Sequence, residues 1–277
     1  MAEKQASNLA VRLATAAVGV PAILALIFIA PAWGFYLLVL AAALVGSSEL
    51  FAMTHPGDRP SQALGVLLSG VASATVFFFH GDPRALVTLV VAIPLLGPLL
   101  TLLRLGEMST AALRACAMGF GPLFVAAPLT MLALLRVELR EAGGGYVLLA
   151  IGFAWLSDTG GYFAGRFLGK HKLYEAVSPK KTVEGAIGGL AAATAWAILG
   201  HYWFAPSLPL LHAVPLAIVA AAIGQAGDLG ESLLKRSTGI KDSGTIVPGH
   251  GGILGRVDAL ILTGAIVYLY VRWLPPL

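Results

Sequence analysis

Charged residues are scarce in this sequence. They make up 12% of its 277 residues, against about 25% in an ordinary soluble domain. Hydrophobic residues make up 58%, and the mean hydropathy is +0.85. Uncharged apolar runs recur along the chain, and about 20 such residues suffice for one helical crossing of a bilayer. The runs are too long and too continuous for the strands of an outer-membrane barrel. The sequence therefore predicts an all-α integral membrane protein.

Cysteine and several catalytic motifs are also missing. Cys116 is the single cysteine and lies in an apolar segment, which excludes an internal disulfide and a cysteine metal cluster. Neither G-x-S-x-G nor H-E-x-x-H occurs, and the stretch 165–170 only approximates a Walker A loop. The formal net charge of +4 comes without a long basic run or a nucleic-acid motif. We therefore expect no nucleic-acid partner and relate the positive charge to membrane orientation and an anionic substrate.

Nine membrane-spanning helices are predicted. The uncharged run 13–48 is far longer than the apolar core of a cleaved signal peptide, which has about 7–15 residues. With a cytoplasmic N-terminus, 14 of the 18 Lys and Arg residues fall on the cytoplasmic side, as the positive-inside rule expects. The C-terminus then lies outside, and the long polar loops 166–183 and 235–256 face the cytoplasm. The predicted helices are 11–30, 33–52, 62–80, 85–104, 112–135, 145–165, 184–204, 212–234 and 257–274.

These helices are predicted to form one continuous membrane domain with two parts. Residues 1–140 hold the N-terminal helices, and residues 141–277 hold the C-terminal helices with the polar clusters. No internal repeat is evident. Many transporters are built from paired halves with interrupted helices, so this absence weighs against a transporter.

The first polar cluster surrounds Asp158. A carboxylate in the middle of a membrane helix costs about 2.5–3.5 kcal/mol on insertion scales, so it usually faces a partner or a polar cavity. Tyr162 and Arg166 share its helix face. Gly161 and Gly165 are spaced so that a second helix can approach closely. A structural salt bridge is the alternative explanation for Asp158.

The second cluster is Ser178-Pro-Lys-Lys-Thr-Val-Glu-Gly185, just before a predicted helix. Lysines and helix N-termini both attract phosphate groups. A loop that merely follows the positive-inside rule would explain the lysines but not the other residues. The substrate-binding residues predicted from these two clusters are Asp158, Arg166, Ser178, Lys180, Lys181, Thr182 and Glu184.

The third cluster follows 43 residues, 185–227, that contain no Asp, Glu, Lys or Arg. On a helix, Asp228, Glu231, Ser232 and Lys235 lie on one face. Carboxylates beside a lysine suit Mg²⁺ with a polyphosphate, and successive glycines let backbone amides approach an anion. Together the clusters suit metal-assisted phosphoryl or nucleotidyl transfer to a lipid. The remaining candidate site residues are Arg236, Lys241, Asp242, His250, Gly251, Gly252, Arg256 and Asp258.

Residues 232–258, S-L-L-K-R-S-T-G-I-K-D-S-G-T-I-V-P-G-H-G-G-I-L-G-R-V-D, closely resemble the signature of phosphatidate cytidylyltransferases, or CDP-diacylglycerol synthases. Residues 158–170, 178–185 and the Gly-Asp-Leu at 227–229 also resemble that family. The resemblance is specific over about residues 155–260. It implies that phosphatidic acid and CTP react to give CDP-diacylglycerol and pyrophosphate at the cytoplasmic membrane of a bacterium. It also implies contact with membrane lipids and the capacity to form a homodimer, and the oligomeric state itself stays open.

The resemblance further implies roles for individual residues. Mg²⁺ would be held by Asp228 and Asp258, and a monovalent cation such as K⁺ is a further expectation. Phosphate contacts would come from Lys180, Lys181, Lys235, Arg236 and Lys241. The residues assigned to catalysis in this way are Asp228, Lys235, Lys241, Asp242, His250, Arg256 and Asp258.

Gly255 departs from the family pattern, which has aspartate there and would supply a metal ligand. Glycine offers no such ligand and costs about 0.5–1 kcal/mol in a helix relative to alanine. Three explanations are open. The chain is a deliberately altered form, or a natural variant in which Asp228 or Asp258 retains the metal, or a non-catalytic relative.

Two other functions are weighed against the leading one. A transporter or binding protein for an anionic lipid or metabolite would use Asp158 and the lysines, but it would place charges near the bilayer midplane. A lipid kinase, or a cytidylyltransferase acting on another lipid phosphate, would share most of the predicted site. Competition between phosphatidate and an isoprenoid analogue would separate these enzymes.

Overall fold

The computed structural model describes residues 17–244 and 251–274. Within these residues, eight helices are long and apolar enough to cross a membrane, and a shorter apolar helix, Ala17–Phe28, precedes them. The prediction of an all-α integral membrane protein is confirmed. Eight of the nine predicted spans have a counterpart, and the first, 11–30, lies partly outside the described residues. The helices are α2 (Ala32–Thr54), α3 (Arg59–Phe79), α4 (Pro83–Leu103), α5 (Ala111–Gly121), α6 (Ala127–Glu138), α7 (Gly143–Leu168), α8 (Val183–Trp203), α9 (Leu210–Ser237) and α10 (Leu254–Trp273).

Irregular turns join some of these helices. The π-helical turn η2 (Pro122–Ala126) connects α5 to α6, so that both belong to one crossing, Met108–Glu138. Short 3-10 turns, η1 (Met108–Thr110) and η3 (Arg140–Ala142), precede α5 and α7. Because a helix start leaves amides without intrahelical partners, side-chain caps matter there. Asp58 accepts from Ser61 N at the start of α3, and Thr182 accepts from Gly185 N at the start of α8.

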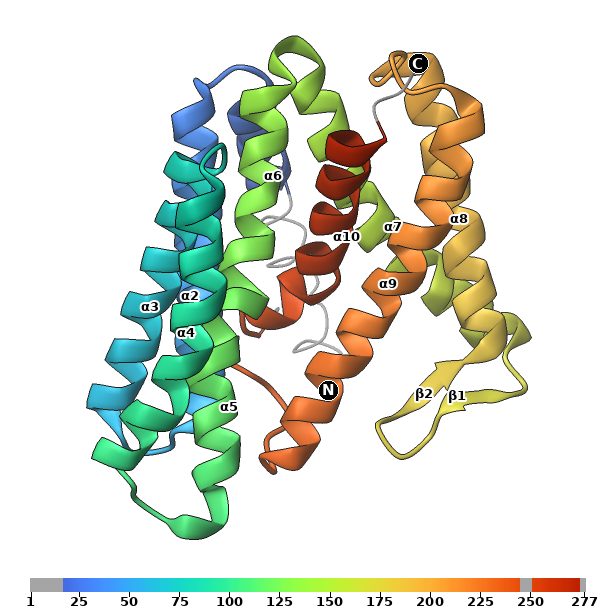
Figure 1. Cartoon of the computed structure of the whole chain (residues 1–277). Coiled ribbons are helices and arrows are strands. Elements are labelled where there is room, and N and C mark those ends of the chain that lie inside the picture. Colours follow the sequence, from blue (N-terminus) through green and yellow to red (C-terminus); the bar gives the residue numbers. More distant parts are fainter. Residues whose placement is uncertain (1–16, 245–250, 275–277) are drawn as a thin grey trace.

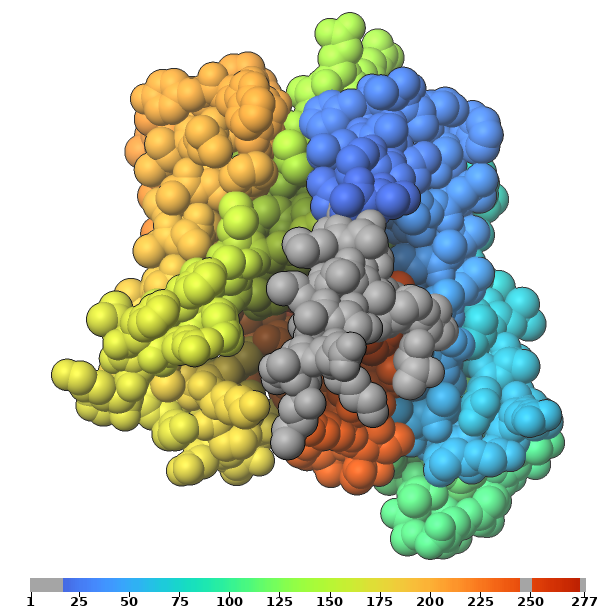
Figure 2. Space-filling view, turned by 180° about the vertical axis from the view of Figure 1, so that it is seen from behind, coloured from blue at the N-terminus to red at the C-terminus, as the bar shows by residue number. Residues whose placement is uncertain are grey.

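The bundle has two flanks and a shared core. Helices α2 to α5 stand on one flank, and α8 and α9 stand on the other (Figures 1 and 2). Between them, α10 packs against α6, α7 and α9, and α7 packs along α8. Tyr146, Phe153, Leu132 and Ile261 are buried in the core between these helices. This core fixes α7, α9 and α10, three helices that carry Asp158, Asp228 and Asp258 among the predicted site residues.

The predicted loop 166–183 contains a β-hairpin that the sequence reading missed. Strand β1 (Lys172–Tyr174) pairs antiparallel with β2 (Ser178–Thr182), with Lys172 opposite Thr182. Helix α7 also extends to Leu168 and α9 to Ser237, beyond their predicted ends. The hairpin and the end of α9 lie at the same end of the bundle (Figure 1), so the polar clusters converge as expected.

Candidate functional site

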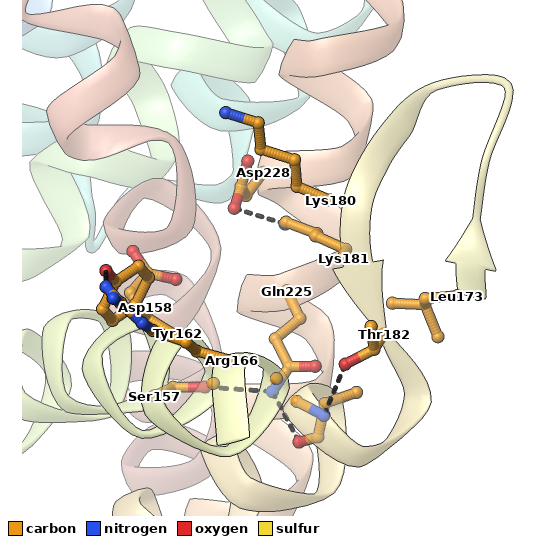
Figure 3. A pocket seen from close by; sticks show the side chains of 14 residues that line it. Ser157, Asp158, Tyr162, Arg166, Leu173, Lys180, Lys181, Thr182, Gln225 and Asp228 are labelled. Carbon is orange, nitrogen blue, oxygen red and sulfur yellow. Dashed lines mark hydrogen bonds and ion pairs between the residues drawn. The ribbon is translucent and has the colours of Figure 1, made fainter. Parts of the chain in front are cut away.

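A cavity of about 350 Å³ opens between α7, the hairpin, α8 and α9. Figure 3 shows Lys180 and Lys181 reaching from β2 toward Asp228 on α9, with Asp158 and Arg166 supplied by α7. The cavity therefore combines residues from all three predicted clusters. The lining residues are Ser157, Asp158, Gly161, Tyr162, Gly165, Arg166, Leu173, Lys180, Lys181, Thr182, Gly185, Ala186, Gln225 and Asp228.

Glycines allow α7 and α8 to meet closely beside this cavity. A Cβ atom at Gly161 would lie 3.3 Å from the carbonyl oxygen of Gly185, and one at Gly165 would lie 3.1 Å from Thr182 Oγ1. Small residues let helix backbones approach in this way. The close approach predicted for Gly161 and Gly165 is thus present, and the partner is the start of α8.

Opposite charges are paired inside the cavity. Lys181 Nζ forms an ion pair with Asp228 Oδ2. Arg166 Nη1 donates to the hydroxyl of Tyr162 at 2.7 Å. The negative charge of Asp228 repels that of Asp158, whereas the positive charges of Lys181 and Arg256 attract it. The site is therefore a mixed cluster of cations and carboxylates, suited to a polyanion that arrives with a metal cation.

Gln225 and Ser157 are cavity residues that the sequence reading missed. Gln225 Nε2 donates to Ser157 Oγ at 3.0 Å and to the carbonyl of Ala186 at 3.1 Å, so one amide links α9 to α7 and α8. A signal was present, because Gln225 is a polar side chain inside an apolar run, and polar groups within a membrane usually have a partner or a function.

A second, smaller cavity of about 30 Å³ is lined in part by Glu231 and Asp258. Glu231 is only 4% exposed. Its Oε2 is ion-paired with Lys235, and within the described residues its Oε1 has no hydrogen-bond partner. Asp228 and Glu231, predicted to share a face of α9, thus line two different cavities.

Position 255 faces this second group rather than Asp228. A Cβ atom at Gly255 would lie 3.4 Å from Glu231 Oε1 and 3.9 Å from Lys235 Nζ. Both distances are ordinary contacts, so the backbone at 255 leaves room for a Cβ atom. Its carboxylate would then lie near a buried carboxylate and a lysine.

Other predicted residues surround the cavities without lining the larger one. Glu184 accepts from the backbone amides of Lys170 and His171 and from the His171 ring, which ties the hairpin to α8. Ser178 pairs with Tyr174 in the hairpin. Ser232 is half-buried on α9. Four of the predicted residues are exposed: Arg236, Lys241, Asp242 and Arg256. Gly251 has a φ of +83°. His250 lies outside the described residues, and Gly252 packs against Glu49 on α2.

Carboxylates are the side chains of this site that could hold a metal ion. Among residues 17–244 and 251–274, no group of three or more His, Cys, Asp and Glu side chains is placed to hold a metal ion. Mg²⁺, however, is usually held by one or two carboxylates and completes its shell with phosphate oxygens and water. Asp228 acts electrostatically on both Asp158 and Asp258. Carboxylate oxygens are donors that Mg²⁺ prefers, so Asp228 and Asp258 are the residues that could hold it.

An apolar helical bundle with a cavity lined by lysine, arginine and aspartate defines a multi-pass membrane protein. The chain belongs to the Cytidylyltransferase family, whose model matches residues 10–274.

Curated relatives narrow this assignment. The chain is 44% identical over 124 residues to a phosphatidate cytidylyltransferase of Staphylococcus saprophyticus, covering 45% of this chain and 48% of that protein. It is 45% identical over 122 residues to the protein of the same name from Staphylococcus haemolyticus, covering 44% and 47%. For the Staphylococcus aureus protein of that name, the identity is 43% over 124 residues, covering 45% and 48%. The matched stretch spans about half the length of these relatives.

Proposed function

We propose that this chain is a phosphatidate cytidylyltransferase that converts phosphatidic acid and CTP to CDP-diacylglycerol and pyrophosphate. The observation that carries the proposal is the cavity in which Lys180, Lys181 and Arg166 converge with Asp158 and Asp228. Its cations suit a triphosphate and a lipid phosphate, and its position at the end of apolar helices suits a membrane-bound substrate. The names of the relatives support the same activity.

In this reaction, a phosphate oxygen of phosphatidic acid attacks the α-phosphorus of CTP, and the bond to the β-phosphate oxygen breaks. Negative charge develops on the bridging oxygen and leaves with pyrophosphate. Lys180, Lys181 and Arg166 neutralise phosphate charge and hold the two phosphates in position, which supplies most of what such a transfer needs. Lys181 is also ion-paired with Asp228, so this carboxylate orients the Lys181 side chain.

Mg²⁺ belongs to the proposal, with Asp228 and Asp258 as its protein ligands. When bound, it would supply charge neutralisation at the phosphate oxygens. A monovalent cation such as K⁺ remains a prediction. Glu231, with its buried Oε1, adds negative charge beside Asp258.

We also propose that the cavity faces the cytoplasm of a bacterium across its inner membrane. The distribution of Lys and Arg supports this orientation, because the predicted topology places 14 of the 18 on the cytoplasmic side. CTP would then reach the cavity from the cytoplasm and phosphatidic acid from the bilayer. Formation of a homodimer remains a prediction.

Activity is best tested in liposomes that contain the full chain, phosphatidic acid and Mg²⁺, with CTP labelled at its α-phosphate. We expect label in CDP-diacylglycerol and release of unlabelled pyrophosphate. Lys181→Gln should lower kcat/KM by about 10- to 100-fold, because it removes a charged phosphate contact. Arg59→Gln is the matched control, since Arg59 is exposed at the same end of the bundle and does not line the cavity.

Other outcomes would favour the alternatives. Transfer of the γ-phosphate of a nucleotide to the lipid would identify a lipid kinase. Preference for an isoprenoid phosphate over phosphatidic acid would identify a different cytidylyltransferase. Movement of an anion across the liposome membrane without nucleotide chemistry would identify a transporter, and equal activity of Lys181→Gln and wild type would remove Lys181 from the site.

A further inference from the structure

Glu49 is a buried carboxylate on α2, far in sequence from the polar clusters. It is 4% exposed and is the only charged residue of α2, whose other residues are mostly apolar. Burial of a carboxylate is unfavourable unless hydrogen bonds compensate for the lost water. The contacts of Glu49 therefore indicate why this side chain is tolerated.

Among residues 17–244 and 251–274, the hydrogen-bond partners of Glu49 are Ser243 and the start of α10. Glu49 Oε1 accepts from the amide of Ile253 at 3.0 Å, and Oε2 accepts from the amide of Leu254 at 2.8 Å. Ser243 Oγ donates to Oε2 at 3.1 Å. Ile253 is the N-cap residue of α10 and Leu254 its first residue. A carboxylate at this point satisfies unpaired amides and complements the positive end of the helix dipole.

Two glycines make room for this carboxylate. A Cβ atom at Gly244 would lie 2.5 Å from Glu49 Oε1, and one at Gly252 would lie 2.4 Å from Oε2. No side chain can stand that close, so the backbone on both sides of residues 245–250 approaches Glu49 only because these positions are glycine. The contact with Glu49 is therefore a structural reason for glycine at position 252, separate from substrate binding.

The first turns of α10 carry Arg256 and Asp258, and Asp258 lines the smaller cavity together with Gly227 and Glu231 of α9. The start of α10 therefore sets where these charges lie relative to the cavity. We propose that Glu49 is a positioning residue that fixes the start of α10 and holds Ser243 and Gly244 against it. Its catalytic consequence rests on the proposed function, whereas its structural consequence does not.

Glu49→Gln tests the proposal, because it keeps the shape of the side chain but replaces one acceptor oxygen with a donor. We expect hydrogen exchange at the amides of Ile253 and Leu254 to become about tenfold faster, while the core amides of α7 keep their protection. We expect kcat for CDP-diacylglycerol formation to fall about tenfold. Glu107→Gln is the control, since Glu107 is an exposed glutamate at the same end of the bundle.

If Glu49 only stabilised the fold as a whole, Glu49→Gln would speed hydrogen exchange at the backbone amides of α7 as well as those of α10. Faster exchange throughout, or unchanged exchange at residues 253–254, would overturn the proposal. Unchanged kcat in a folded Glu49→Gln protein would overturn the catalytic consequence. If wild type makes no CDP-diacylglycerol but the local exchange result holds, the proposed function fails and the positioning role stands.

A second variant guards against failure of Glu49→Gln to fold. Ser243→Ala removes one donor to Glu49 and leaves the two amide contacts of α10 in place. We expect a smaller fall in kcat, roughly two- to fivefold, as for the loss of one hydrogen bond. Wild-type kcat in Ser243→Ala would contradict the proposed attachment of this segment to Glu49.

Discussion

At position 255, this chain lacks the carboxylate that its relatedness to phosphatidate cytidylyltransferases leads us to expect. The space for it remains, because a Cβ atom there makes only ordinary contacts with Glu231 and Lys235. An aspartate could therefore take Lys235 as a partner and add a charge of −1 beside Asp258. Single residues can thus change the charge of the site without changing the fold.

Gly255→Asp should raise turnover by about tenfold or more and lower the Mg²⁺ concentration needed for half-maximal rate, if the added carboxylate joins Asp258 as a ligand, as the family pattern implies. The measurement is CDP-diacylglycerol formation in liposomes over a range of Mg²⁺ concentrations. Gly255→Asn is the control for size and helix propensity. Equal gains from Asp and Asn would assign the effect to helix stability, and no gain would mean that Asp228 and Asp258 suffice.

Among the elements, the contact between α7 and α8 gives the cavity its shape. A Cβ atom at Gly188 would lie 2.2 Å from the Cβ of Ala164, and one at Gly160 would lie 2.5 Å from the Cβ of Ala192. These contacts continue the approach made by Gly161 and Gly185 beside the cavity. Two helices that meet this closely hold the hairpin and its lysines in a fixed relation to Asp158.

Gly188→Leu should separate α7 from α8, because a large side chain cannot fit against Ala164. We expect a loss of stability of about 1–3 kcal/mol, as for other overpacked interfaces, and a lower kcat/KM. Thermal unfolding in detergent and the activity assay measure the two effects. Gly70→Ala in α3 is the control, because its Cβ atom would make an ordinary 3.5 Å contact with Leu44. A Gly188→Leu protein as stable as wild type would refute the close contact between α7 and α8.

On the scale of the whole molecule, one end of the bundle carries the polar clusters and is called the polar end here. The hairpin and the end of α9 share one end, whereas the turn after α3 lies at the other (Figure 1). The proposed cytoplasmic exposure of the polar end follows from the Lys and Arg distribution. The orientation decides whether cytosolic CTP can reach the cavity.

Cysteine labelling tests this orientation in a Cys116→Ser background. A membrane-impermeant maleimide added to intact cells should label Gly81→Cys but not Glu175→Cys, and disruption of the membrane should expose Glu175→Cys. Gly81 lies between α3 and α4, and Glu175 lies in the turn of the hairpin. The reverse pattern would invert the topology and contradict access of cytosolic CTP.

The sequence by itself determined the membrane class, the eight observed spans and the approximate location of the site. Long uncharged runs leave no alternative to helices in a bilayer, since every backbone amide must be satisfied within the segment. Spacing on a helix also placed Asp158, Tyr162 and Arg166 together. The signature around Asp228 and Asp258 led to the family before any geometry was known.

The tertiary structure alone decided which separated segments touch. A sequence read without its relatives does not say which helices are neighbours, so the contact of Glu49 with the start of α10, 204 residues from Glu49 at Ile253, was not predicted. The same holds for the link from Gln225 to Ser157 and for the separation of Asp228 from Glu231. The hairpin escaped prediction because its strands are short and polar, and their pairing depends on the fixed ends of α7 and α8. Periodicity governs single helices, whereas packing between helices governs the site.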